Sequence, residues 1–210
     1  MNIDENKRLA RWAMDYALKN GCQAANVLFD FSLHTDVGLA GAKVDRLEQA
    51  VAGKLSLSMY VDGHYGNIST NRLNRKELET FVKNGIESTR YLAKDEARVL
   101  ADPSRYYKGG KTDLKLYDAK FALLTMDDRL AMAKAVAEDA FDKDERIVHL
   151  EFSYTEEEHF AYRLISNGFE GETKSTCCSL WAHVTVKGEG EARPSASWYE
   201  SSIFMVDLIK

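Results

Sequence analysis

Two short turn signals constrain this chain more than any other feature of its sequence. Asp62-Gly63 and Asn167-Gly168 each stand between runs in which apolar and polar residues alternate. Such dipeptides favour tight hairpins because both residues tolerate positive φ, and the alternation is typical of strands with one buried face. Short turns also favour antiparallel pairing, because parallel pairs need long crossovers. The sequence therefore predicts antiparallel sheet in both halves of the chain.

Three amphipathic helices are expected beside these strands. Residues 4–20 carry apolar residues at helical spacing and end at an Asn-Gly stop signal. A second helix is predicted to begin after Asn74, with Glu77 three residues further on as in a capping box. A third is predicted to start at Thr125, with Asp128 in the equivalent position.

The expected strands fall into two groups of four. They are 25–33, 43–51, 55–61 and 65–70, followed by 146–154, 159–166, 170–187 and 192–202. We expect a loop at 34–41, an interruption at Gly53 and turns at Glu156–Glu158 and Gly188–Glu191. The predicted fold class is α+β, with two helix-plus-antiparallel-meander halves and mostly antiparallel sheet with flanking helices. The alternative is that any α+β chain of this length would show some such recurrence.

The two halves predict a division of the chain 1–210 into subdomains 1–94 and 113–210. Between them, 95–112 reads as a connector, because Asp102-Pro103 and Gly109-Gly110 break any regular pattern. The sequence leaves open whether the two meanders form one sheet or two separate subdomains.

The composition narrows the class of function. The net charge is −5 and the pI about 5.6, which gives little support for binding nucleic acid through its phosphates. No run approaches the roughly 20 apolar residues of a transmembrane helix, and the first residues carry no apolar signal core. Three cysteines, Cys22, Cys177 and Cys178, suit a reducing compartment. We therefore expect a cytoplasmic protein without direct contact to nucleic acid or membrane.

Metal-ligating residues are few. None of the five histidines forms the helical two-histidine motif of a zinc peptidase. His149 and Glu151 are predicted to share a strand face and could be two ligands of a metal, and Glu156–Glu158 beside His159 could bind a cation. The alternative in both places is a set of solvated surface side chains, since a metal site needs at least three convergent ligands.

The remaining candidate functional residues are possible nucleophiles and two aromatic pairs. The chain has no Gly-x-Ser-x-Gly elbow and no Cys-x-x-Cys. Adjacent strand residues point to opposite faces, so we expect one of Cys177 and Cys178 in the core and the other at the surface. Tyr106-Tyr107 and Trp198-Tyr199 could be aromatic anchors at an interface, with plain core or strand packing as the alternative.

Several segments together resemble one family. They are residues 16–21, 44–48, 57–71, 113–118, 144–147 and 165–169. Their order and spacing are similar to those of the amino-terminal domain of the TldD/PmbA family, which is described as modulators of DNA gyrase and as zinc-dependent peptidases. The resemblance spans nearly the whole chain. The connector, the Asp-Leu-x-Leu-Tyr segment and the Ser-Asn-Gly hairpin look more like PmbA, also called TldE, while a TldD-like chain stays open.

The resemblance implies a longer, two-domain protein. In TldD-type chains the zinc motif lies in a carboxy-terminal domain that we expect to be absent from this chain. No family metal ligand is therefore carried over to a residue here, and zinc is implied only for a TldD-type catalytic subunit. PmbA-type chains are thought to lack that metal, and the implied partners are a TldD-like subunit or a second copy in a homo-oligomer, with peptides as substrate.

Two functions follow from these observations. The first is a substrate-enclosing and assembly domain of a peptidase complex acting on small or unfolded peptides, with no catalytic, cofactor-binding or metal residue of its own. Its candidate substrate-facing residues are Asp62, Gly63, His64, Asn167 and Phe169, for which plain turn residues are the alternative. The second is a non-proteolytic binding module that modulates a partner such as DNA gyrase. The sequence does not identify the peptide.

Overall fold

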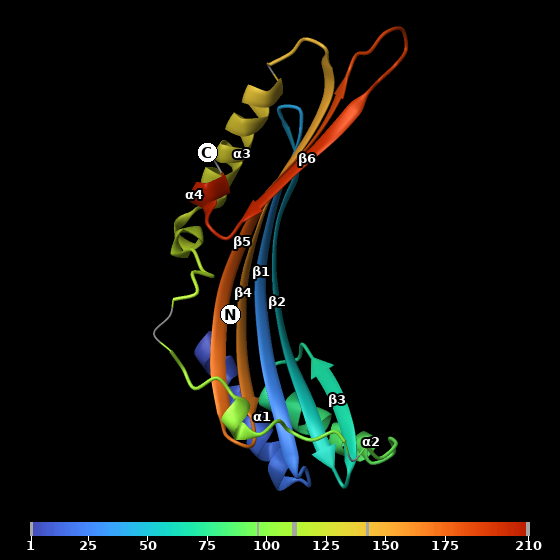
Figure 1. Ribbon diagram of the computed structural model, residues 1–210, viewed down its shortest axis with the longest axis vertical. Helices are drawn as coiled ribbons and strands as arrows, with labels where there is room; N and C mark the ends of the chain where they lie inside the picture. Colours follow the sequence, from blue (N-terminus) through green and yellow to red (C-terminus); the bar gives the residue numbers. More distant parts are fainter. Residues whose placement is uncertain (1, 96, 111–112, 142, 209–210) are drawn as a thin grey trace. The chain divides into compact units, whose positions relative to one another are not determined.

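The computed structural model describes residues 2–95, 97–110, 113–141 and 143–208. Its elements are α1 (Ile3–Lys19), β1 (Ala24–Ala40), β2 (Lys43–Val61), β3 (His64–Thr70), α2 (Arg75–Thr89), the short 3-10 turns Pro103–Arg105 and Ala119–Leu123, α3 (Met126–Phe141), β4 (Ile147–Ile165), β5 (Phe169–Val186), β6 (Ser195–Ser202) and α4 (Met205–Leu208). The strands form one six-stranded antiparallel sheet in the order β3-β2-β1-β4-β5-β6 (Figure 1). The α+β class with mostly antiparallel sheet is confirmed.

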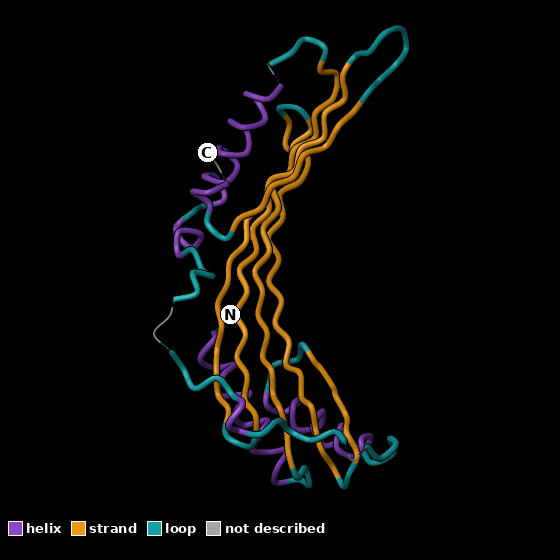
Figure 2. The backbone as a smooth tube through the Cα atoms, in the orientation of Figure 1, coloured by secondary structure: helices purple, strands orange, loops and turns teal. Residues whose placement is uncertain are grey.

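Three expected interruptions are wrong. β1 continues through the predicted loop to Ala40, β2 runs through Gly53, and β4 runs through Glu156–Glu158 (Figure 2). A glycine weakens a strand but still offers both backbone groups to the ladder. Glu156 is held inside the strand by a buried arginine partner that local sequence does not reveal. Two pairs of expected segments are therefore continuous, and the eight expected strands become six.

The helix starts follow the local signals. The Asn74 side chain accepts a bond from the Glu77 amide at 3.0 Å, and α2 begins at the next residue. Thr125 and Asp128 form the reciprocal capping box before α3, since each side chain accepts from the other's amide at 3.1 and 2.8 Å. These caps satisfy amides that have no partner within the helix, so both predicted starts are confirmed.

Both turn signals lie where the sequence predicts them. Asp62 (φ 52) and Gly63 (φ 82) form the two-residue turn between β2 and β3, whose register continues as Tyr60 opposite Tyr65. Positive φ at both positions is the requirement of a type I′ hairpin. Gly168 (φ 113) closes the loop between β4 and β5, and its amide donates to the Ile165 carbonyl at 3.0 Å.

The described chain divides into two compact units. Unit 1 consists of residues 1–31, 52–113 and 160–173, and unit 2 of residues 32–51, 114–159 and 174–210. Each unit has its own apolar core. Whether 1–94 and 113–210 behave as separate subdomains stays a prediction.

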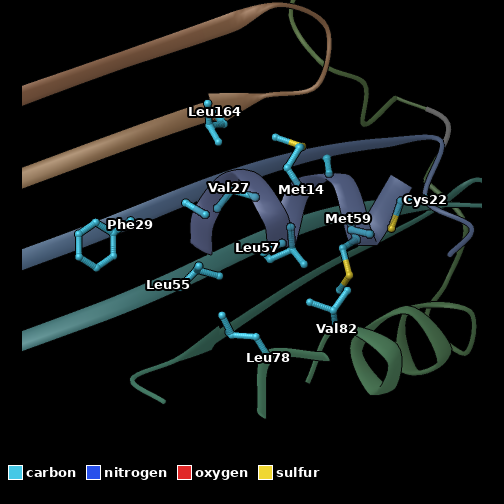
Figure 3. Close-up of a cluster of buried hydrophobic side chains, with 14 of the residues drawn as sticks. Met14, Cys22, Val27, Phe29, Leu55, Leu57, Met59, Leu78, Val82 and Leu164 are labelled. Carbon is cyan, nitrogen blue, oxygen red and sulfur yellow. The ribbon is translucent and has the colours of Figure 1, made fainter. Parts of the chain in front are cut away.

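The core of unit 1 lies between helices and sheet. Figure 3 shows Met14 of α1 and Leu78 and Val82 of α2 against Phe29 of β1 and Leu57 of β2. In unit 2, α3 and α4 pack on the alternate residues of β1, β4 and β5 that point to one face. Burying one such large apolar side chain stabilises the fold by about 1.5–3 kcal/mol. The cores fix the strands, and the strands position the turns described next.

Candidate functional site

The predicted residues Asp62, Gly63 and His64 lie at the β2–β3 turn of unit 1. Arg90 Nε donates to Asp62 Oδ2 at 3.2 Å, and the Asp62 amide donates to Gln23 Oε1 at 2.7 Å. The Nδ1 atom of His64 lies 2.7 Å from the Leu92 carbonyl oxygen. Because a carbonyl only accepts, this His64 nitrogen carries the proton. The turn is therefore a fixed set of donors and acceptors.

The predicted residues Asn167 and Phe169 lie at the β4–β5 hairpin, also in unit 1. Asn167 Nδ2 donates to the Ala101 carbonyl at 2.9 Å, and the Tyr106 hydroxyl donates to Asn167 Oδ1, also at 2.9 Å. The rings of Phe169 and Tyr106 are 5.4 Å apart and tilted at 56°. Both predicted residues of the hairpin are thus engaged by residues of the connector.

One chain segment contacts both candidate surfaces. We call residues 92–95 and 98–106 the connector strap. At its start the Asp95 amide donates to the Gly63 carbonyl at 3.1 Å, and further on the Arg98 guanidinium lies 4.5 Å from the centre of the Tyr65 ring. At its end Tyr106 reaches Asn167. Figure 2 shows this loop in teal passing over strands of unit 1.

The strap lies on the face of the sheet that points away from α1 and α2. Tyr60 alternates with the buried core residues Met59 and Val61, so it points to the opposite face. The Tyr60 and Tyr65 rings are 5.2 Å apart. Burial raises the pKa of the Tyr60 phenol most, and the electrostatic interaction with Tyr65 raises it further. The Tyr60 phenol is therefore a neutral hydrogen-bonding group, and its ring packs against that of Tyr65 on this face.

A small polar group lies on the same strands. Asn67 Nδ2 donates to Ser58 Oγ at 2.8 Å. Among the buried side-chain atoms of the described residues, only Asn26 Oδ1 has no hydrogen-bond partner. Asn26 alternates with the buried Ala25 and Val27 and so also points away from the helices. An unfilled acceptor on a strand is a place where a ligand N–H or a water can donate.

A groove of about 350 Å³ lies beside the β4–β5 hairpin of unit 1. Its lining includes Met14 and Leu18 of α1, Leu164, Phe169, and charged residues at the rim. Hydrogen bonding from Tyr162 first, and then from Arg11, lowers the pKa of the Glu170 carboxyl on that rim. The groove thus combines an apolar floor with an ionised carboxylate, which suits an apolar side chain next to a donor.

The candidate metal ligands do not converge. His149 Nε2 lies 3.0 Å from Glu151 Oε1, so the expected shared face is confirmed, but the two groups bind each other. Glu156 is paired with Arg129 instead of lying in a solvated turn. No cluster of three histidine, cysteine or acidic side chains able to hold a metal occurs among the described residues.

The cysteines lie as their alternation predicts. Cys177 is exposed and Cys178 is buried. Burial raises the pKa of the Cys178 thiol to about 12 and that of Cys22 to about 11. At neutral pH neither buried thiol is a nucleophile, because only the thiolate attacks.

Sequence reasoning found the two turns but missed what they contact. The pair Tyr106-Tyr107 was a candidate anchor. In the structure Tyr106 anchors the strap to the hairpin, while Tyr107 is exposed. Trp198 and Tyr199 of β6 are both more than half exposed. The contact of Arg98 with Tyr65 has no local signal, because it joins residues 33 positions apart across an irregular segment.

Comparison with known proteins points to one family. A sequence profile described as the PmbA/TldA metallopeptidase central domain matches residues 120–210. A search of curated proteins finds no match. A solved structure from Bacteroides thetaiotaomicron, described as a candidate modulator of DNA gyrase, is 72% identical with a TM-score of 0.91. The alignment covers 100% of this chain and 48% of that one.

Two further solved structures share the fold at low identity. A candidate modulator of DNA gyrase from Thermotoga maritima is 21% identical, with a TM-score of 0.76 over 96% of this chain and 44% of that one. TldE from Thermococcus kodakarensis is 12% identical, with a TM-score of 0.71 over 95% of this chain and 43% of that one. The chain thus spans about half the length of the structures it matches. Within the described residues, no helix has the length and apolar character needed to cross a bilayer.

Proposed function

We propose, from the premise that this chain belongs to the TldD/PmbA family, that it is a substrate-enclosing and assembly domain of a zinc-dependent peptidase complex. The substrates are small or unfolded peptides, and the subunit is the non-catalytic, PmbA-like one. The 72% identical relative and the central-domain profile support the family. The connector, the segment 113–118 and the hairpin at 165–169 support the PmbA-like assignment.

One observation carries the peptide-binding part of the proposal. Unit 1 already holds an extended piece of polypeptide, the connector strap, against the two surfaces expected to face a substrate. The Gly63 carbonyl accepts a backbone amide, while His64 and Asn167 donate to backbone carbonyls. Contacts to main-chain groups bind extended chains without reading their sequence. A peptide of varied sequence would use the same groups in place of the strap. The groove beside Phe169, which α1 lines, offers a separate place for an apolar side chain.

The described residues do not fit a zinc site. His149 and Glu151 bind each other and have no third ligand within the described part of the chain. In the proposal zinc belongs to the TldD-like partner, and the residues of this chain bind, orient and enclose the peptide. The polar turn and hairpin restrict the motion of the bound chain, which raises the effective concentration of its scissile bond.

The test uses the whole protein mixed with its TldD-like partner. We expect a stable mixed complex by light scattering and zinc-dependent cleavage of an unfolded peptide. A photo-crosslinking phenylalanine in place of Phe169 should attach to that peptide, whereas the same group in place of the exposed Tyr199 of unit 2 should not. Labelling at neither or at both positions would count against unit 1 as the peptide-binding part. A complex that forms but cleaves nothing would refute the peptidase role.

The second candidate is a binding module that modulates a partner such as DNA gyrase. The description of the 72% identical relative favours it. Purified gyrase and a TldD-like chain, offered in equal amounts to the immobilised whole protein, distinguish the two. Retention of gyrase alone supports the second candidate, and retention of the TldD-like chain alone supports the first.

A further inference from the structure

One stretch of β2 has no strand on its outer side among the described residues. β3 pairs with β2 only from Leu55 opposite Thr70 to Val61 opposite His64. We call residues 43–51 the open edge, a part of β2 that belongs entirely to unit 2. All nine of its residues are exposed. Its backbone amides and carbonyls on that side are thus available to another strand.

The open edge lacks most of the usual protection against pairing. Exposed edges are normally short, bulged, interrupted by proline or lined by charged side chains. The open edge has only the last of these, in Lys43, Asp45, Arg46 and Glu48. This one is nine residues long, contains neither proline nor glycine, and exposes three large apolar side chains, Val44, Leu47 and Val51. Because side chains alternate along a strand, Leu47 and Val51 share one face, and Val44 lies on the other. An added strand would cover apolar surface on both faces.

We propose that the open edge pairs antiparallel with the open edge of a second copy of this chain, on a two-fold axis at Leu47. This goes beyond the proposed function, which does not say which surface joins subunits. In this register Leu47 lies opposite Leu47 of the partner subunit. Arg46 then lies opposite Glu48 of the partner subunit, and the symmetry makes that contact twice. Directly opposite side chains have Cβ atoms about 4.5–5.5 Å apart, close enough for an ion pair.

Charge selects this register over its neighbours. Side-chain alternation allows only shifts that keep each residue on its own face. Centring the axis on Arg46 or on Glu48 would place two arginines or two glutamates directly opposite each other, which is destabilising. Centring it on Gln49 would leave both charges opposite alanine, Glu48 opposite Ala50 and Arg46 opposite Ala52. Centring it on Val44 would place Lys43 opposite Asp45, but only three residues of each open edge would then lie opposite each other. Among the registers that overlap at least five residues of the open edge, only the one on Leu47 pairs opposite charges.

In the free subunit Arg46 is bound to the neighbouring strand β1. Its Nε donates to Asp36 Oδ2 at 2.8 Å, and its stem packs over Gly38, where an added Cβ would lie 3.2 Å from Arg46 Cβ. A guanidinium has five donors, so Arg46 can keep Asp36 and still bind a second carboxylate.

The other edge of unit 2 is strand β6, where charge does not select a pairing register. β6 is eight residues long and carries a single charge, Glu200. Pairing of β6 with itself would therefore have no opposite-charge register. This strand supplies the matched control.

The first test is a symmetric cross-link in the whole protein with the exposed thiol removed by Cys177→Ser. With Leu47→Cys added, mild oxidation should give a disulfide-linked dimer, since only a residue on the axis meets its own copy at disulfide distance. Asp45→Cys, which would face Gln49 of the partner subunit, and Ser197→Cys on β6 should stay monomeric under the same conditions. Equal cross-linking of all three, or none with Leu47→Cys, would overturn the proposal.

The second test exchanges the charges and needs no new thiol. Glu48→Arg should raise the dimer dissociation constant roughly tenfold, because two attractive cross-strand pairs become repulsive. A mixture of Glu48→Arg with Arg46→Glu should form a mixed dimer, since each arginine again meets a glutamate. Sedimentation velocity measures both, and circular dichroism checks that Arg46→Glu still folds. A wild-type protein that is monomeric at micromolar concentration contradicts the proposal, whatever its activity on peptides.

Discussion

The two units bury different kinds of polar group. The buried polar side chains of unit 1 are uncharged, namely Asn6, Ser58 and Thr89. Those of unit 2 include three charged ones, Asp118, Arg129 and Glu156. In unit 2 the guanidinium of Arg129 lies 2.6 Å from Glu156 and also donates to the Phe121 carbonyl at 3.0 Å, while the Tyr154 hydroxyl donates to Glu156 at 2.5 Å. The described core of unit 1 is therefore stabilised without a buried ion pair, whereas unit 2 depends in addition on the buried pair of Arg129 and Glu156.

The coverage of the sheet differs as well. In unit 1, α1 and α2 pack on one face and the connector strap crosses the other. In unit 2, α3 packs on one face. The other carries half-exposed groups such as His34, Ser153 and Trp181. A burial pattern alone would thus favour unit 1 as the rigid binding part and unit 2 as the part that meets other chains.

The largest predicted difference between the units comes from Glu156. Glu156→Ala leaves Arg129 buried without its carboxylate, and we expect a loss of about 3–5 kcal/mol in the free energy of unfolding. Glu170→Ala in unit 1 removes a half-exposed partner of Arg11 and should cost at most about 1 kcal/mol. Urea unfolding followed by circular dichroism measures both. Equal losses would mean that the ionic contact does not distinguish the units.

A steric prediction of intermediate size concerns Gly66. An added Cβ there would lie 2.1 Å from the Oγ1 atom of the buried Thr89, so Gly66→Ala should destabilise unit 1 by about 1–3 kcal/mol. Adding Thr89→Ala removes the clash and should recover part of the loss. Gly38→Ala in unit 2, where the nearest atom is at 3.2 Å, is the control and should be milder. Thermal unfolding curves of the four proteins decide the order.

The connector strap provides a smaller test. Tyr106→Phe removes the hydroxyl that donates to Asn167 and should weaken the strap by about 0.5–1.5 kcal/mol. Tryptic cleavage after Arg105 should then become roughly two- to tenfold faster, because cleavage follows the population of the open segment. Tyr199→Phe on the exposed β6 should leave the rate unchanged. An unchanged rate in Tyr106→Phe would show that the ring contact with Phe169 holds the strap by itself.

The smallest expected effect is a difference in the rate at which the native cysteine thiols are labelled. At pH 8 iodoacetamide should modify Cys177 readily, and Cys22 and Cys178 only when their units open. Burial raises both pKa values, to about 11 and about 12, so the thiolate fraction grows only as the pH approaches those values. Mass spectrometry of labelled peptides then follows unit 1 through Cys22 and unit 2 through Cys178. Rapid labelling of either buried thiol in the folded protein would contradict the described cores.

The local signals predicted local structure well. The caps at Asn74 and Thr125 and the turn at Asp62-Gly63 involve residues at most three positions apart, so their chemistry is visible in the sequence. The expected strand interruption at Glu156 was wrong because the deciding partner is distant in the chain. Glu156 reads as a solvated turn residue until Arg129, 27 positions earlier, is placed beside it.

The candidate site was predicted in the same uneven way. The turn at Asp62–His64 and the hairpin at Asn167–Phe169 lie where expected, but nothing in their sequence indicates that one connector contacts both. That contact depends on an irregular segment whose path is set by Tyr106 and Arg98. Periodicity carries no information about such a path, because the segment has no repeating pattern.

The composition of the unit 1 core has a consequence for the order of synthesis. Its helices and first three strands are complete by Thr89, but Phe160, Tyr162 and Leu164 of β4 belong to the same core. The 74 residues from Ile86 to Phe160 take roughly 4–15 s at about 5–20 residues per second. During that interval the apolar faces of α1 and α2 have an incomplete sheet to pack on. The nascent chain thus exposes part of its apolar surface for seconds before its first core can close.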